Sequence, residues 1–219
     1  MDKLRLRFEK TGRAVYISHL DLMHTLQRAF NRAGLALKYS EGFNPHPQIS
    51  IALPLSVGVE SVCEILDFRL LTDCDPAALP ARLTAVLPEG LVVTDCYEAV
   101  HKVAQLKYLS ISGSFEYDAR PVDEMCAALR DFYARESIVI TKKTKRGVGE
   151  SDIRPAVKEI SFAPGEGAVT LRAVISAQEP TLNPALLADA LSQLSPSLAP
   201  DFAKFRRLEN YLENGQVFR

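Results

Sequence analysis

Apolar and polar residues alternate over residues 4–8 (LRLRF), a period of two that predicts a β-strand. Residues 18–33 change to a period near 3.6, with apolar side chains on one side and polar ones on the other, which predicts an amphipathic helix. Gly34 follows as a helix-stop residue. The same patterns predict extended segments at 35–39, 49–53, 62–71 and 91–97 and a helix over 75–87.

The second half of the chain repeats this order of elements. Strands are predicted at 108–117, 137–143 and 205–212, a hairpin at 159–163 and 168–175, and helices at 122–135 and 183–194. A β-α-β-β-α-β order is the signature of the ferredoxin-like fold. The sequence therefore predicts an α+β protein of two tandem ferredoxin-like (βαββαβ) subdomains with antiparallel sheets, spanning 1–100 and 106–219 and joined near 100–105.

Composition places the chain among ordinary globular proteins, with 219 residues, 47% apolar and 24% charged. No apolar run reaches membrane-spanning length, and the N-terminus has no signal-peptide core, so we expect a cytoplasmic protein without membrane contact. The cysteines Cys63, Cys74, Cys96 and Cys126 are widely spaced, which predicts reduced thiols, no metal site and no cofactor held by the chain itself.

The net charge of −1 hides an uneven distribution. Residues 1–50 hold eight Lys/Arg and four Asp/Glu (+4), and residues 51–100 hold two and eight (−6). Residues 101–150 return to +2 and residues 151–219 to −1. This pattern predicts one basic face and permits nucleic-acid contact without requiring it.

The segment 39–47 (YSEGFNPHP) is the strongest candidate for a functional loop. Glycine and asparagine allow unusual backbone angles, and two prolines restrict the chain around them. In the expected topology this loop meets the segment 11–18 at one end of the sheet. The candidate binding residues there are Arg13, Tyr16, His19, Phe43, Asn44 and His46.

Simpler structural roles are available for several of these residues. Ser18 and Asp21 fit a helix capping box, which explains both without catalysis. His19 is either a buried, hydrogen-bonded histidine or a partner of His46 across a cleft. As a pair, His19 and His46 are candidate acid–base catalysts, whereas no third ligand with a recognised spacing supports a metal site.

The second half has a basic segment followed by a compact motif. Lys142, Lys143, Lys145 and Arg146 precede a glycine-rich turn and are interpreted either as a solvated, mobile loop or as a phosphate-contacting arm. Asp152 and Arg154 belong to the motif DIRP (152–155). They form either a structural ion pair or helix start, or part of a binding cleft in which Asp152 is a third catalytic candidate.

Four motifs occur along the chain: Gly12-Arg13 with residues 16–23 (YISHLDLM), 39–47 (YSEGFNPHP), 52–55 (ALPL) with 58–61 (GVES), and DIRP. Together they resemble the motifs of the bacterial radical SAM-linked protein family, a domain of unknown function. The resemblance implies association with a radical SAM protein that binds cobalamin, and a context of RNA metabolism.

Three functions compete on this basis. The first is a non-catalytic module that recognises RNA or presents a substrate to a radical SAM enzyme, in the context of RNA modification or processing, and more a partner than an autonomous enzyme. The second is a protein-binding adaptor without RNA contact. The third is an RNA-acting enzyme, either a metal-independent endoribonuclease or a protein resembling the pseudouridine synthases. Because the aromatic RNP signature of RNA-binding sheets is missing, we expect RNA contact through loops and not through a sheet face.

Overall fold

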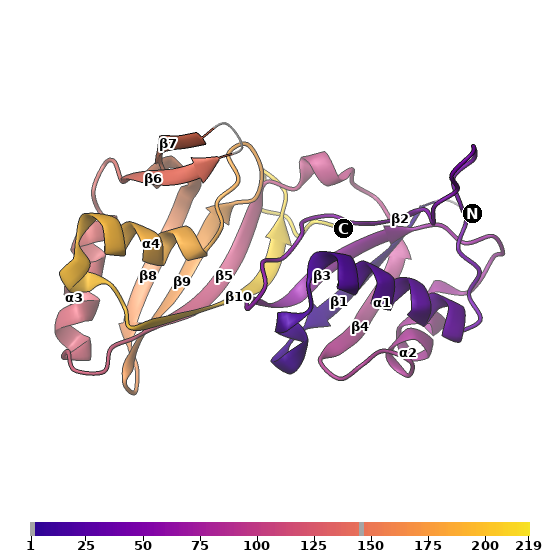
Figure 1. Ribbon diagram of the computed structural model, residues 1–219, viewed down its shortest axis with the longest axis horizontal. Coiled ribbons are helices and arrows are strands. Elements are labelled where there is room, and N and C mark those ends of the chain that lie inside the picture. The colour runs from indigo at the N-terminus through magenta and orange to yellow at the C-terminus, as the bar shows by residue number, and fades with distance from the viewer. Residues whose placement is uncertain (1–2, 145–146) are drawn as a thin grey trace. The chain divides into compact units, whose positions relative to one another are not determined.

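The computed structural model describes residues 3–144 and 147–219, and for Lys143 and Thr144 it describes the backbone alone. The chain forms two compact units, Met1–Gln105 with Arg219, and Leu106–Phe218. Each unit combines helices with an antiparallel sheet (Figure 1).

The sheet of the first unit has the order β4-β1-β3, with β2 on the far side of β3, and each neighbouring pair is antiparallel. The helix α1 lies across one face of this sheet (Figure 1). The elements are β1 (Leu4–Lys10), η1 (Gly12–Tyr16), α1 (His19–Arg32), β2 (Ile49–Ile51), β3 (Glu60–Phe68), η2 (Pro76–Ala78), α2 (Leu79–Thr84), β4 (Leu91–Glu98) and η3 (Val103–Gln105), where η is a 3₁₀ turn.

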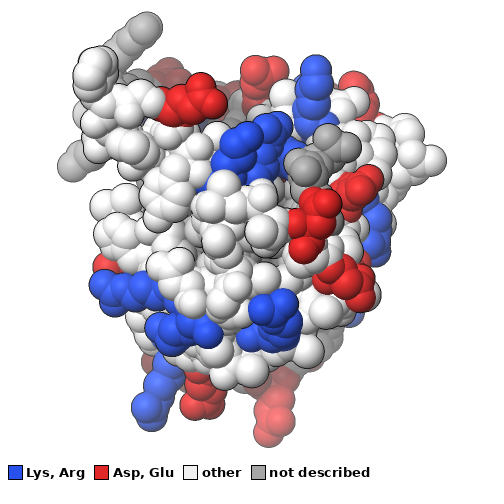
Figure 2. Space-filling model, turned by 90° about the vertical axis from the view of Figure 1, so that its right-hand side faces the viewer, with Lys and Arg blue, Asp and Glu red and all other residues white. Residues whose placement is uncertain are grey.

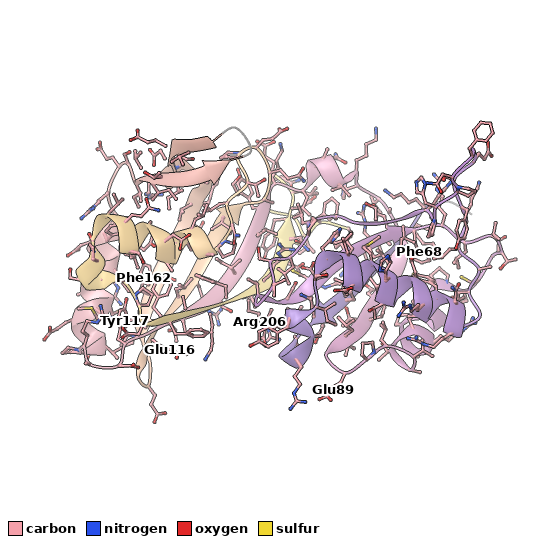
Figure 3. The ribbon with its side chains drawn as sticks, viewed as in Figure 1. Phe68, Glu89, Glu116, Tyr117, Phe162 and Arg206 are labelled. Carbon is pink, nitrogen blue, oxygen red and sulfur yellow. The ribbon has the colours of Figure 1, made fainter. Side chains whose placement is uncertain are left out.

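The helix α1 agrees closely with its sequence pattern. Leu22, Leu26 and Phe30 are buried against the sheet, and the ring centroids of Phe30 and Phe68 lie 4.9 Å apart (Figure 3 labels Phe68). Gly34 takes a φ of +68°, the left-handed conformation that ends a helix at low cost. The apolar face of the helix and its glycine stop thus lie at the positions that the sequence predicts.

Two predicted elements of this unit are different in the structure. The segment 35–39 makes only single bridges, Leu37 to Leu70 and Tyr39 to Pro47, and is not a full strand. The helix expected over 75–87 is divided into η2 and α2. Pro80 lies in the first turn of α2 and lacks an N–H, so a continuous helix through this point would lose a hydrogen bond.

The sheet of the second unit has the order β10-β5-β9-β8, again antiparallel at every step. Figure 1 shows α3 and α4 on one face of it. The elements are β5 (Tyr108–Glu116), α3 (Val122–Tyr133), β6 (Val139–Thr144), β7 (Gly147–Asp152), η4 (Arg154–Ala156), β8 (Val157–Pro164), β9 (Ala168–Ser176), α4 (Ala185–Leu194), η5 (Pro196–Leu198) and β10 (Phe202–Tyr211).

An inserted hairpin separates α3 from β8. β6 and β7 form a two-stranded sheet of their own, in the register Val139 to Asp152 and Thr144 to Gly147. The side-chain amide of Gln193 on α4 holds it through two hydrogen bonds to the backbone of Thr141, at 2.8 and 3.1 Å. The glycine-rich sequence had predicted a turn here, so β7 is a strand that the periodicity missed.

The second core is built around aromatic rings. Phe162 stacks on Tyr133 with ring centroids 5.4 Å apart, and Phe115 lies 6.1 Å from Phe205 (Figure 3 labels Phe162). Burial raises the pKa of Tyr133 well above its usual range, and its hydroxyl donates to the carbonyl of Leu187. This bond joins α3 to α4.

The four cysteines are free thiols. Among the described residues, no helix is both long and apolar enough to cross a membrane.

Candidate functional site

The loop 39–47 is an excursion from the edge of the first sheet. The N–H of Lys38 donates to the carbonyl of Arg69 at 2.8 Å, and the N–H of Gln48 donates to the carbonyl of Lys38 at 2.7 Å. The chain thus leaves the sheet edge after Lys38 and returns to it at Gln48. The residues between form a loop with closely spaced ends, a type of loop that often carries function.

Hydrogen bonds inside the loop fix the position of His46. The N–H of Ser40 donates to the carbonyl of His46 at 2.9 Å, and the N–H of His46 donates to Ser40 Oγ at 3.1 Å. Ser40 Oγ also lies 2.9 Å from His46 Nδ1. Because Nδ1 is engaged, Nε2 is the ring nitrogen that remains for a ligand.

The tip of the loop exposes its aromatic residue completely. Phe43 has a relative exposure of 112%, and it follows Gly42, whose φ is +120°. A phenylalanine that gains nothing from burial in the folded chain is a candidate contact for a partner. Asn44 beside it is exposed as well.

A groove of about 360 Å³ lies at the base of the loop. Its lining is Lys3, His46, Pro47, Gln48, Ile49, Ser50, Asp67, Phe68 and Arg69. His46 therefore shares a hollow with two basic side chains from different strand ends. The groove suits an anionic group such as a phosphate, with the imidazole as a further polar contact.

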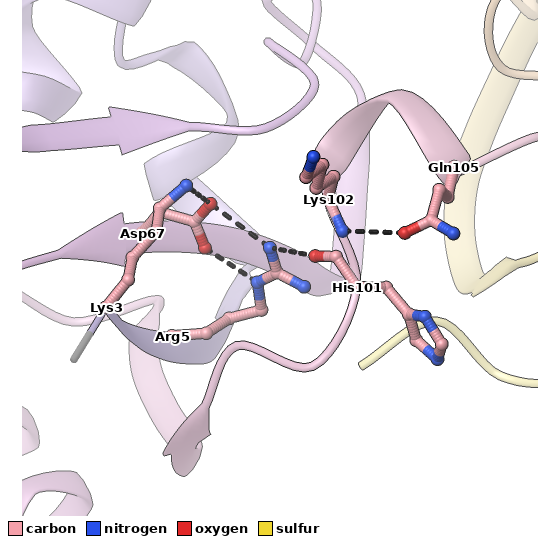
Figure 4. Close-up of polar contacts among 6 residues, drawn as sticks. All are labelled: Lys3, Arg5, Asp67, His101, Lys102 and Gln105. Carbon is pink, nitrogen blue, oxygen red and sulfur yellow. Dashed lines mark hydrogen bonds and ion pairs between the residues drawn. The ribbon is translucent and has the colours of Figure 1, made fainter.

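A buried ion pair supports the floor of this groove. Asp67 lies between Lys3 and Arg5, with oxygens 2.5 Å from Lys3 Nζ and 2.6 Å from Arg5 Nε (Figure 4). Arg5 also donates to the carbonyl of His101 at 3.0 Å. Arg5 and Asp67 are almost fully buried, whereas Lys3 is half exposed. Asp67 is thus neutralised, and the accessible charges of the groove are basic.

The predicted meeting of the two loops was wrong. At one end of β1, Lys10 pairs with Ser61 and Leu91, and the segment 11–18 continues from that end. At the other end Leu4 pairs with Phe68, which in turn pairs with Ile49 at the start of β2. Figure 1 shows η1 at the arrowhead end of β1 and the loop 39–47 at the opposite end.

The reason lies in the edge of the sheet. The prediction treated 35–39 as a whole strand with the loop at its C-terminal end, but the loop precedes β2. The side chains of His19 and His46 therefore do not face one cleft. His19 is also exposed, and not the buried histidine that its helical phase had suggested.

The start of α1 is a helix cap, as predicted. Ser18 Oγ accepts a hydrogen bond from the N–H of Asp21 at 3.2 Å and donates to Asp21 Oδ2 at 2.7 Å. The carboxylate of Asp21 occupies the positive end of the helix dipole. Arg13 and Tyr16 are exposed on the preceding turn. The length of β1 separates them from the groove, which lies at its other end.

The DIRP motif ties together three segments of the second unit. Asp152 accepts from the N–H of Ile138 and Arg154 and from Ser137 Oγ, at 2.9–3.0 Å. These hydrogen bonds, led by the one from Ile138, hold the pKa of Asp152 below its usual value. Arg154 donates to the carbonyls of Arg135 and Val157. Asp152 and Arg154 therefore hold residues 135–138 and 157 together, which is a structural role.

The basic segment is only partly described. Lys142 lies on β6 opposite Gly149 and is half-buried, and Lys143 lies opposite Val148. Lys145 and Arg146, also predicted as phosphate contacts, lie outside the described residues.

Sequence reasoning missed Lys3 and Arg69 as groove residues. The two are 66 positions apart in the sequence, and only the pairing of β1 with β3 brings them together. Across the face shown in Figure 2, basic and acidic side chains are interspersed. Within the described part of the chain, no group of three His, Cys, Asp or Glu side chains is placed to hold a metal.

Solved structures resemble this chain in fold at low identity. A chain of a Cbf5-Nop10-Gar1 complex matches with a TM-score of 0.52 and 13% identity, over 96% of this chain and 50% of that one. The present chain thus spans about half the length of that relative. No protein in a search of curated sequences matches.

Two further structures match with TM-scores too low for any structural argument. An unknown protein from Galdieria sulphuraria matches at 0.27, with 11% identity over 94% of this chain and 98% of that one. The CRISPR endoribonuclease Cse3 bound to a 19-nucleotide RNA matches at 0.20, with 13% identity over 94% and 99%.

The family comparison covers most of the sequence. Residues 3–184, which include the loop 39–47, the groove and the DIRP motif, match DUF2344. The chain therefore belongs to this family, described as an uncharacterized protein conserved in bacteria.

Proposed function

We propose that this chain is a non-catalytic module that binds single-stranded RNA through the loop 39–47 and the groove beside it. The observation that carries the proposal is the fully exposed Phe43 on a hydrogen-bonded loop above a groove that contains Lys3, His46 and Arg69. Aromatic rings stack on bases, and basic side chains contact phosphates. The combination fits a nucleotide strand better than either feature alone.

The same geometry favours binding over catalysis. The acid–base hypothesis required His19 beside His46, and the register of β1 separates them. The hypothesis of a pseudouridine synthase-like aspartate rested on Asp152, whose carboxylate accepts three hydrogen bonds from its own unit. Binding needs neither arrangement.

We also propose that both units are ferredoxin-like. In each, the first strand pairs with the third and fourth strands and the second lies outside the third, all antiparallel, if the hairpin β6-β7 is counted as an insertion. This is the order expected of a βαββαβ unit. Ferredoxin-like units bind RNA in other proteins, which is an argument by analogy.

A radical SAM protein is the partner that we propose for this module, on the basis of the motif resemblance. A surface at the other end of the first unit fits protein contact. Tyr16, Leu20 and Val57 are 74%, 70% and 58% exposed. A hydrogen bond of 3.0 Å from Gly58 N–H to the Val15 carbonyl brings their segments together. Exposed apolar groups of this kind mark interaction surfaces.

The RNA proposal is tested by fluorescence anisotropy with a labelled single-stranded 12-mer of uridine. Phe43→Ala is expected to weaken binding, and Tyr16→Ala, which removes an exposed aromatic ring at the opposite end of the same unit, is the matched control. Equal binding by wild type and Phe43→Ala, or no binding by wild type at low salt, would reject the proposal.

The partner proposal is tested by recovering the tagged chain from its native cells. Leu20→Asp is expected to lose the radical SAM protein while it retains RNA. If the wild-type chain recovers proteins without RNA, the adaptor function replaces RNA recognition.

A further inference from the structure

The sheet of the second unit has one face that its helices do not cover. Leu109, Ile111 and Phe115 of β5 are buried, and Phe115 reaches Tyr133 of α3 through Phe162, so these residues lie on the face that α3 and α4 cover in Figure 1. Successive strand residues point to opposite faces, so Tyr108, Ser110, Ser112, Ser114 and Glu116 lie on the other side. Ser110, Ser112 and Ser114 have short side chains, so the row from Tyr108 to Glu116 forms a shallow floor along the central strand β5.

Arginines lie on both sides of this floor. Arg206 of β10 is paired with Ser112, and Ser112 is paired with Arg172 of β9 (Figure 3 labels Arg206). Because neighbouring strands are about 4.8 Å apart, the two arginine backbones are about 10 Å apart across the short serine. Lys204 repeats the pattern one row away, opposite Ser114.

Aromatic rings lie toward the two ends of the floor. Phe202 is 54% exposed opposite Glu116, with Lys204 Nζ 5.2 Å from its ring centroid. At the other end, Lys158 Nζ lies 4.7 Å from the ring centroid of Tyr108. Eight residue steps of about 3.4 Å separate Tyr108 from Glu116, so the floor is about 27 Å long, enough for several nucleotides.

The acidic side chains of this face lie outside the row of Arg172 and Arg206. Glu116 is neutralised by Lys204, whose Nζ lies 2.6 Å from its carboxylate. Glu159 and Glu209 are in the row of Ser110, one row beyond the arginines. A hollow of about 270 Å³ lies over Ser110, Ser161 and Arg172.

We propose that this face is a second contact surface for single-stranded RNA, with bases on Phe202 and Tyr108 and phosphates on Arg172 and Arg206. The inference rests on the proposed function for the class of ligand only, since it uses none of the same residues. The missing RNP motif had argued against a stacking sheet face. The two rings, Phe202 and Tyr108, are 94 positions apart in the sequence, so no short sequence motif contains both of them.

The test is anisotropy of the full chain with a fluorescein-labelled 12-mer of uridine across a salt series. Phe202→Ala is expected to weaken binding about five- to 150-fold, the usual loss for one stacked base, while Phe202→Tyr keeps the ring and the affinity. Arg172→Ala is expected to reduce the log–log salt slope by about 0.7. The matched control is Arg135→Ala, which removes an exposed arginine just after α3.

The outcomes separate this surface from the loop. If Phe43→Ala weakens binding while Phe202→Ala and Arg172→Ala do not, the sheet face is rejected and the loop is retained. If only the sheet-face variants weaken it, the loop is rejected and the sheet face is retained. If a labelled oligoglutamate peptide binds in place of the RNA and Arg172→Ala abolishes that binding, the occupant is an acidic protein segment, and the inference is overturned.

Discussion

The segment 11–18 and the loop 39–47 contain similar residues, and the fold uses them in opposite ways. The first is held on both sides, by a hydrogen bond from Thr11 N–H to the Gly90 carbonyl at 2.8 Å and by the bond from Gly58 to Val15. Ala14 and Val15 are buried. In the second, the hydrogen bonds of Ser40 and His46 are internal, and Phe43 is fully exposed.

The difference shows that residue type does not locate a site. Tyrosine, serine and glycine occur in both segments, but one segment closes a core and caps a helix. The other leaves the edge of a sheet, where no second strand holds it. At the edge strand of a sheet, a loop can extend outward without breaking hydrogen bonds between neighbouring strands. Four predictions test this division, from the largest effect to the smallest.

The groove under the loop 39–47 is expected to depend on Asp67. Asp67→Ala leaves the buried Arg5 uncompensated and is expected to lower the free energy of unfolding by about 3–5 kcal/mol. Lys3→Ala removes the half-exposed partner of the same carboxylate and is expected to cost at most about 1 kcal/mol. Urea unfolding measures both, and equal losses would mean that the pair is not the support of the groove.

Gly90→Ala and Gly42→Ala compare the packing of the two segments. A Cβ at Gly90 would lie 2.3 Å from the Thr11 carbonyl oxygen, and its φ is +86°, so we expect a loss of about 3 kcal/mol. At Gly42 nothing lies within 4 Å of the added Cβ, which leaves only backbone strain of about 1 kcal/mol. Thermal unfolding decides, and a loss at Gly42 as large as at Gly90 would show that the loop is packed.

Phe43→Ala is expected to change binding without changing stability. Its ring is fully exposed, so the free energy of unfolding should stay within about 0.5 kcal/mol of wild type. Affinity for single-stranded RNA should fall by about 1–3 kcal/mol, the contribution of one stacked base. A stability loss in urea would place the ring in the core and contradict the structure.

Ser18→Ala and Ser40→Ala make the same change at the two segments. Loss of the cap at Ser18 is expected to lower stability by about 1 kcal/mol with RNA affinity unchanged. Loss of the Ser40 hydroxyl frees the ring of His46 and should lower affinity with little effect on stability. Urea unfolding measures the stability of both variants, and anisotropy measures their RNA affinity. A stability loss for Ser40→Ala together with an affinity loss for Ser18→Ala would contradict the roles assigned to the two segments.

Periodic and local features of the fold were predictable from the sequence. The helix α1, its Ser18 cap and the Gly34 stop depend on residues within a few positions of one another. The strand β7 was not predicted, because its glycine-rich sequence becomes a strand only through pairing with β6. The division between η2 and α2 was missed although its cause is local, since Pro80 in the sequence interrupts a continuous helix.

The candidate site was predictable in part. His46, Phe43 and the unusual backbone of Gly42 are visible in the motif 39–47. Lys3 and Arg69 were not, because strand pairing and not sequence proximity brings them to the groove. The expected link between His19 and His46 failed for the same reason, since it required knowing on which side of β2 the loop lies.

By itself the sequence determined the elements whose free energy is local: an amphipathic helix with its cap, alternating strands, and a loop preset by glycine and proline. The tertiary structure alone decided which of these elements are neighbours. Register along β1 and β3 placed the loop and the helix cap at opposite ends of the first unit. It did so because burial of one sheet face fixes the pairing of every strand, and with it the position of each loop.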